Sequence, residues 1–394
     1  MDNRSIVFSD FEISSGSISF HFNDSFDAGD SDENRLYFNL SDPIIPQTDL
    51  IAIAISTLCG EKYFSIHYEL NVSPSVLKDI SVFTGAKVTA SENNNVFYRT
   101  KRYNITLNFS GGFDSLCTKC LMPDDVNLVS IDFGGRFSRE REFYEKFGAH
   151  IMETNLVETP LIEDTWEFMG IASILYSDYL ATAFNSFGTI LEASENNLSD
   201  NPTGVNNISR PPFKMAGMEN APYVLGLTEV GTLLVLSHHA PELISPSLDS
   251  LAHPGEEKRY RKQVLAMIVS GKTKTDFNLN IVDHPPKPYF KFGESFAADF
   301  LSFYIIKNAG LEVASHTISE IPDEVVKLTN RLSLEFFEKI NPKFIVNFPK
   351  PLLNGFMSKL EAAKIYQYSE KDWDEFIQVR EILSQYYDLS ISIL

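Results

Sequence analysis

The sequence predicts an α/β protein with a doubly wound parallel sheet, an N-terminal α+β domain and a helical C-terminal region. Strand-like and helix-like segments alternate from residue 103 to residue 193, which is the pattern of consecutive βαβ units. Before them, apolar and polar residues alternate as in half-buried strands, and after residue 285 helical periodicity is interrupted by prolines. We therefore expect domains at 1–100, 101–284 and 285–394.

The N-terminal region is expected to combine strands with two helices. Apolar residues alternate with polar ones from Ile18 to Phe22, and two later segments are rich in β-prone side chains. The second helix should begin at Ser73 or Ser75 as the N-cap and end near Gly85. The expected elements are strands at 18–22, 37–40 and 63–70 and helices at 49–58 and 75–84.

The middle region predicts a parallel sheet whose ligands bind beyond the carboxyl ends of its strands. Its polar, proline-rich connection over 196–222 is predicted to be a mobile flap above that edge. The expected strands are 103–109, 127–132, 150–155 and 189–193, and the expected helices are 113–121, 138–147 and 171–187.

Composition restricts the class of protein. With 33 basic and 53 acidic side chains, the 394-residue chain has a formal charge of -20, which disfavours general nucleic-acid binding. The sequence shows no apolar run long enough to span a membrane and no leader segment at its start. Its three cysteines cannot form a disulfide framework. These features predict a cytoplasmic location.

The loop after the first strand of the middle region has the residues needed to hold phosphates. Glycines allow main-chain N–H groups to approach phosphate oxygens, and the helix that follows adds the positive end of its dipole. Asp114 is expected to hold magnesium, because a carboxylate would repel bare phosphates. The loop consists of Ser110, Gly111, Gly112, Phe113, Asp114 and Ser115. A simple tight turn is the alternative.

This loop resembles the SGGxDS signature of PP-loop ATP pyrophosphatases, and the resemblance covers about residues 110–265. It implies a sheet of the HUP type found in that superfamily, with ATP and Mg²⁺ as cofactors. It also implies that residues 110–115 bind the nucleotide.

A second segment, IDFGGRFSRE at 131–140, resembles the FDYGQRHxxE segment of QueC-type 7-cyano-7-deazaguanine synthases. By this resemblance the backbone around Ile131, Asp132 and Phe133 would contact adenine, and Arg136 would face phosphate or a substrate carboxylate. A solvated helix face carrying Arg136 is the alternative. The chain departs from that family because no cysteine follows Cys120, so its four-cysteine zinc site is missing. The segment 192–195 also lacks the glycine-led substrate motif of that family.

Lys258 and Lys262 lie in a basic run and share a helix face. In several PP-loop enzymes a late lysine or arginine closes on the phosphates, and an exposed basic helix turn is the alternative. Cys117 and Cys120 fall on the apolar stripe of the predicted helix 113–121, which favours a core position over structural zinc.

These resemblances imply an ATP-dependent ligase that forms AMP and pyrophosphate by adenylating a carboxylate or amide for attack by a nucleophile such as ammonia. Its substrate would be a small molecule, a modified peptide or a nucleotide, and its partners a second copy or proteins of a defence operon. The alternatives are base thiolation of tRNA and a non-catalytic, nucleotide-sensing subunit of a phage-defence system. The expected catalytic residues are Asp114, Ser115, Arg136, Lys258 and Lys262.

Overall fold

The computed structural model describes residues 4–25, 34–98, 101–163 and 165–389. By internal packing the chain forms two compact units, which we call the sheet unit and the helical unit. The sheet unit comprises Met1–Ser110, Asp125–Ser186 and Ile208–Asn220, and the helical unit comprises Gly111–Asp124, Phe187–Asn207 and Ala221–Leu394. The domains predicted from the sequence are consecutive segments that meet near residues 100 and 284, whereas each compact unit combines segments that are separated in the sequence. The predicted domain boundaries therefore stay predictions.

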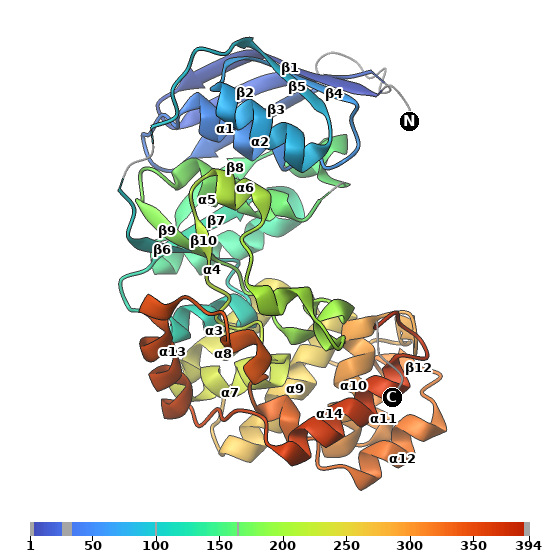
Figure 1. Ribbon diagram of the computed structural model, residues 1–394. Coiled ribbons are helices and arrows are strands. Elements are labelled where there is room, and N and C mark those ends of the chain that lie inside the picture. The colour runs from blue at the N-terminus through green and yellow to red at the C-terminus, as the bar shows by residue number, and fades with distance from the viewer. Residues whose placement is uncertain (1–3, 26–33, 99–100, 164, 390–394) are drawn as a thin grey trace. The chain divides into compact units, whose positions relative to one another are not determined.

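The sheet unit has the α/β architecture that the sequence predicts, with a mostly parallel sheet of ten strands (Figure 1). The spatial order is β10-β9-β6-β7-β8-β3-β2-β1-β4-β5, and antiparallel pairing is confined to β8-β3, β3-β2 and β2-β1. The strands are β1 (Ser5–Ser14), β2 (Ser17–Asp24), β3 (Arg35–Leu40), β4 (Ser65–Asn71), β5 (Lys87–Glu92), β6 (Asn104–Asn108), β7 (Asn127–Asp132), β8 (His150–Thr154), β9 (Thr182–Ser186) and β10 (Glu219–Asn220).

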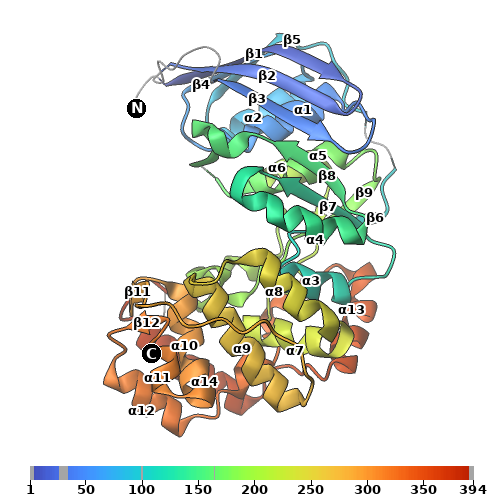
Figure 2. The ribbon, with the colours of Figure 1, turned by 180° about the vertical axis from the view of Figure 1, so that it is seen from behind.

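The N-terminal strands follow the predicted alternation, because Ile18, Phe20 and Phe22 of β2 are all buried. Helices α1 (Thr48–Ser56) and α2 (Pro74–Thr84) cover one face of these strands, which lie in front of the two helices in the view from behind (Figure 2). α2 begins after Ser73 and ends at Gly85, whose φ of 68° suits glycine, as predicted. Strands β1 and β5 were not predicted from the sequence.

The predicted helix at 171–187 and the predicted strand at 189–193 are wrong. Helix α5 covers only Ile171–Tyr176, and strand β9 follows at Thr182–Ser186. A turn follows α5 as far as Ala181, which has a φ of 47°, and β9 then pairs with β6. The threonine hydroxyls of Thr182 and Thr106 lie 2.7 Å apart inside this pair. The apolar residues of 171–187 fit the periodicity of a helix as well as that of a strand. Pairing with a neighbouring strand therefore decides which of the two structures forms.

The predicted helix at 138–147 is also largely irregular. It consists of two 3₁₀ segments, Gly135–Glu140 and Glu145–Phe147, on either side of the short α4 (Arg141–Tyr144). Short 3₁₀ turns are frequent at the ends of α-helices and in connecting segments. In contrast, the predicted helix at 113–121 and the predicted strand at 127–132 agree with α3 and β7.

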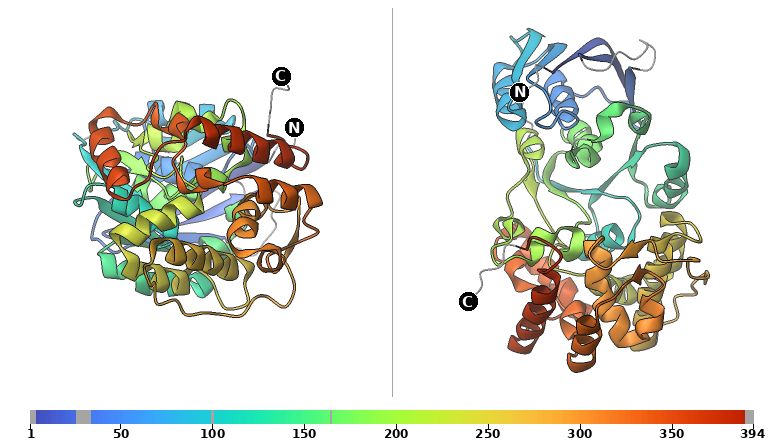
Figure 3. Two further views of the ribbon diagram at one scale, coloured as in Figure 1. Left: turned by 90° about the horizontal axis from the view of Figure 1, so that it is seen from below. Right: turned by 90° about the vertical axis from the view of Figure 1, so that its right-hand side faces the viewer.

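The helical unit packs its helices around an aromatic core, and the C-terminal region is mainly helical as predicted. α10 packs against both α9 and α14 (Figure 3). The helices are α3 (Phe113–Leu121), α7 (Glu229–His239), α8 (Ile244–Leu251), α9 (Glu257–Thr273), α10 (Phe296–Ala309), α11 (Leu311–Ala314), α12 (Asp323–Arg331), α13 (Lys350–Ala362) and α14 (Glu370–Leu383). In the described part of the chain, every helix is too short or too polar to cross a membrane.

Candidate functional site

The loop before α3 has one of the two backbone features expected of it. Gly111 has a φ of 78°, a left-handed conformation that favours glycine. Gly112 is the N-cap of α3 with a φ of −71°, which other residues adopt equally well. Ser110 is the last residue of its segment of the sheet unit, and the rest of the loop belongs to the helical unit.

Contacts within the helical unit fix the start of α3. The Ser247 hydroxyl donates to the carbonyl oxygen of Gly111 at 2.6 Å, and the Ser115 hydroxyl donates to the carbonyl oxygen of Gly112 at 3.1 Å. Gly188 approaches so closely that a Cβ atom there would lie 2.7 Å from the backbone nitrogen of Ser115. Position 188 therefore accepts only glycine without a shift of the backbone, a constraint that no local sequence pattern indicates.

Asp114 and Lys262, predicted from distant parts of the sequence, interact electrostatically in the helical unit. Burial raises the pKa of Asp114, and the Lys262 ammonium group partly offsets this effect. The Oδ1 atom of Asp114 is buried and accepts no hydrogen bond from the described residues. Lys262 lies over the ring of Phe113, with Nζ 5.0 Å from the ring centroid. α9 thus brings a cation to the first turn of α3.

A buried network of ion pairs holds Lys262 in place. Its Nζ lies 2.9 Å from Glu229 Oε1, and Arg261 donates to the other oxygen of Glu229 at 2.9 Å and to Glu257 at 2.8 Å. Burial alone would raise the pKa of Glu229, but Lys262 and Arg261 hold it below its usual value. Asp114 and Glu229 raise the pKa of Lys262 against the effect of burial. Lys262 is therefore charged in this cluster.

Glu192 is the carboxyl group of this region that sequence reasoning passed over. Its Oε1 atom accepts the backbone N–H of Glu229 at 2.7 Å, at the start of α7, whereas Oε2 is buried with no hydrogen bond from the described residues. Burial raises the pKa of Glu192 to about 8, and the nearby Glu229 and Asp114 add to this effect. Tyr368 interacts with Glu192 electrostatically, and its buried hydroxyl also has no hydrogen-bond partner among the described residues. An acidic residue inside the apolar run GTILEA was the available signal.

We define the acid cluster as the side chains of Asp114, Glu192, Glu229, Glu257, Arg261 and Lys262. The carboxyl groups outnumber the cations, and all of these residues belong to the helical unit. Lys258 lies on α9, as Lys262 does, but its side chain is exposed whereas that of Lys262 is buried. The two lysines that were predicted to share a helix face therefore lie in different environments.

The predicted adenine-contacting segment lies in the sheet unit, at the end of β7. Asp132 is buried, accepts the backbone N–H of Gly134 at 2.9 Å and binds Arg141 at 3.0 Å. The ring of Phe133 packs edge to face on Phe137 and Phe168, with centroids 6.0 Å apart in both pairs. Ile131 is the penultimate residue of β7, and Arg136 lies in the 3₁₀ segment that follows. The carboxylate of Asp132 thus stabilises its own turn.

The cysteine pair lies on α3 as expected. Cys117 is buried, Cys120 is half-buried, and both thiols are free. Burial raises the pKa of Cys117, so this thiol is a poor nucleophile. Across the described ranges, no group of three or more histidine, cysteine or acidic side chains has the geometry to hold a metal ion.

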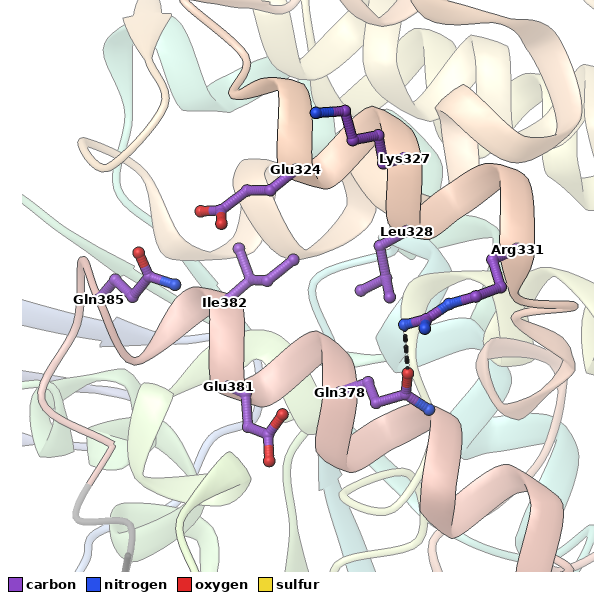
Figure 4. A pocket seen from close by; sticks show the side chains of 8 residues that line it. All are labelled: Glu324, Lys327, Leu328, Arg331, Gln378, Glu381, Ile382 and Gln385. Carbon is purple, nitrogen blue, oxygen red and sulfur yellow. Dashed lines mark hydrogen bonds between the residues drawn. The ribbon is translucent and has the colours of Figure 1, made fainter.

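A separate cavity of about 490 Å³ lies between α12 and α14 of the helical unit (Figure 4). Arg331 of α12 donates to Gln378 of α14 at 2.6 Å across it. Its other lining residues are Glu324, Lys327, Leu328, Glu381, Ile382 and Gln385. None of the site residues predicted from the sequence lines this cavity.

Comparison of the chain with protein-family models, curated proteins and solved structures gives no match.

Proposed function

We propose that this chain is an ATP-dependent ligase of the PP-loop type, which adenylates a carboxylate or amide and releases pyrophosphate. The observation that supports the proposal best is the electrostatic interaction of Asp114 with Lys262 at the first turn of α3, a turn that begins two residues after the left-handed Gly111. A glycine, a helix start and a lysine can stabilise bound phosphate, and a carboxylate can hold the accompanying metal ion. The PP-loop kinship and the HUP type of the sheet belong to the same proposal.

In the proposed reaction, an oxygen atom of the acceptor attacks the α-phosphorus of ATP, and the bond to the bridging oxygen breaks as pyrophosphate leaves. A nucleophile then attacks the activated carbon and displaces AMP. Lys262 would neutralise charge that develops on pyrophosphate, and the start of α3 would orient the phosphates. Asp114 would hold Mg²⁺, which supplies charge neutralisation at the phosphates. Its buried Oδ1 atom, which has no hydrogen-bond partner among the described residues, fits that role.

The predicted roles of Ser115, Lys258 and Arg136, and the adenine contacts of residues 131–133, stay sequence predictions within this proposal. Base thiolation is less well supported, because it usually needs a reactive cysteine and burial keeps Cys117 protonated. A nucleotide-sensing subunit is the second candidate. The ion pair between Lys262 and Glu229 favours this second candidate. Lys262 would have to leave Glu229 before it could bind a phosphate, so nucleotide binding would change the contacts of Glu229.

The test measures nucleotide binding and turnover separately. Wild-type protein should bind Mg²⁺-ATP and should release pyrophosphate and AMP when supplied with an acceptor-containing fraction of cell extract. Lys262→Ala should lose at least tenfold in affinity or turnover, whereas the exposed Lys287→Ala should behave as wild type. Binding without pyrophosphate release from any fraction would identify a sensing subunit. Absence of nucleotide binding would refute both candidates.

A further inference from the structure

Glu229 is held by two cations, and the two contacts differ in geometry. The guanidinium group of Arg261 donates one hydrogen bond to Oε2 of Glu229 at 2.9 Å and another to Glu257 at 2.8 Å. Nζ of Lys262 lies 2.9 Å from Oε1 of Glu229, yet that buried atom accepts no hydrogen bond of good geometry from the described residues. Arg261 is therefore fixed by directed hydrogen bonds, whereas Lys262 contacts Glu229 as an ion pair.

The two cations also differ in what else they contact. The guanidinium group of Arg261 lies between two carboxylates of the acid cluster and binds both. The ammonium group of Lys262 lies against α3 instead, with Nζ 5.0 Å from the ring centroid of Phe113, the first residue of that helix. A lysine is a point charge on a flexible chain, so it changes partner more readily than a forked guanidinium group. Lys262 is therefore the cation that can turn to an anion at the start of α3.

Such a change of partner would be costly if Lys262 were the only cation beside Glu229, because it would leave a buried carboxylate uncompensated. Arg261 removes this obstacle, since its hydrogen bond to Oε2 of Glu229 does not involve Lys262. We propose that Arg261 is a positioning residue that keeps Glu229 compensated while Lys262 turns from Glu229 to a phosphate of the nucleotide, an inference that rests on the proposed function. Arg261 then acts on the nucleotide only through Glu229 and Lys262.

The affinity of the full chain for α,β-methylene-ATP with Mg²⁺, measured by isothermal titration calorimetry, tests this role. Arg261→Gln leaves Lys262 as the cation that must compensate Glu229, so Lys262 should stay there and the affinity should fall about tenfold or more. Arg261→Lys restores a positive charge beside Glu229 and should recover most of that loss. Arg331→Gln is the matched control, because it removes an arginine of the same unit that binds Gln378 of α14, and its affinity should equal that of wild type.

A double variant separates positioning from a purely structural role. Combining Arg261→Gln with Glu229→Gln removes the negative charge that retains Lys262, so Lys262 can turn to the phosphates and the affinity should return to that of wild type or exceed it. If Arg261 only stabilised the fold, the second substitution would not restore binding. Circular dichroism establishes that each variant is folded. A double variant that binds no more tightly than Arg261→Gln, or an unchanged affinity in Arg261→Gln, would overturn the role of Arg261.

A crystal structure of the wild-type chain with Mg²⁺ and α,β-methylene-ATP keeps the test independent of how the variants fold. We expect Nζ of Lys262 within hydrogen-bond distance of a phosphate oxygen and apart from Glu229, with the hydrogen bond from Arg261 to Glu229 retained. Bound nucleotide with Lys262 still on Glu229 would overturn the inference and leave the proposed function intact. Failure of the wild-type chain to bind the nucleotide would overturn both.

Discussion

The Nζ atom of Lys262 lies 2.9 Å from Oε1 of Glu229, and both side chains are almost fully shielded from solvent, with exposed fractions of 4%. Burying two charges is costly, and the cost is met only if both partners remain. This pair is therefore expected to dominate the stability of the region around α7 and α9.

Replacing Glu229 by Gln should lower the free energy of unfolding by about 3–5 kcal/mol, because it leaves the buried charges of Lys262 and Arg261 without their shared carboxylate. The control is Lys272→Met, which breaks the more exposed ion pair of Lys272 with Glu338 and should cost at most about 1 kcal/mol. Urea denaturation of both variants measures the difference. Equal losses of unfolding free energy in the two variants would show that burial does not determine how much these ion pairs contribute to stability.

Gly188→Ala should destabilise the protein by about 1–3 kcal/mol and weaken nucleotide binding, because the new Cβ would lie 2.7 Å from the backbone nitrogen of Ser115 and displace the start of α3. Gly271→Ala is the matched control. It lies inside α9 with no atom within 4 Å of its Cβ position, so alanine should be neutral or stabilise the helix by up to about 1 kcal/mol. Thermal melting and nucleotide titration of both variants provide the comparison.

Asp114→Ala should abolish Mg²⁺-dependent AMP formation and leave the unfolding free energy within about 1 kcal/mol of wild type. Burial raises the pKa of this carboxyl group, so the relief of its desolvation should largely offset the lost interaction with Lys262. Circular dichroism melting and AMP production are measured on the same sample. Unchanged turnover would remove Asp114 from the mechanism, whereas unfolding would show that the carboxyl group is structural.

Asp299 predicts a pH dependence of stability in the acid range. It accepts hydrogen bonds from Tyr387 and from the backbone of Gly293, both at 2.6 Å, yet burial raises its pKa to about 6. Its protonated form is favoured in the folded state, so its contribution is fully present below about pH 4 and is lost as pH rises through 6. Asp299→Asn should therefore gain stability relative to wild type between pH 4 and pH 7, by on the order of 2 kcal/mol. A constant difference between the two proteins would contradict the prediction.

Protein purified without added metal is expected to contain no stoichiometric zinc, because its only close cysteine pair lies on α3 with Cys117 buried. Elemental analysis provides the metal content. Reagents that modify thiols should label half-buried Cys120 well before Cys117, whose pKa burial raises. Near-stoichiometric zinc that disappears in Cys117→Ser or Cys120→Ser would contradict this assignment.

The parts of the fold that were predicted correctly depend on local signals. α3 starts at a glycine pair and α2 ends at Gly85, and these signals act within a few residues of chain. The end of α5 and the position of β9 were missed, because pairing with β6 decides the structure of that apolar run. In the same way, the sequence singled out Asp114 and Lys262 by residue type. The burial of Glu192 and the close approach of Gly188 depend on tertiary packing that no motif records.

The antiparallel pairing of β3 with β8 has a consequence for how the chain can be divided. Residues 38–40 hydrogen-bond to residues 152–154, so the N-terminal strands protect one edge of the parallel strands β6–β9. A chain shortened to residues 101–394 would leave the N–H and C=O groups of β8 unpaired along that edge, which is a template for aggregation. Strand β3 therefore covers an edge of β8 that would otherwise be open to pairing with other chains.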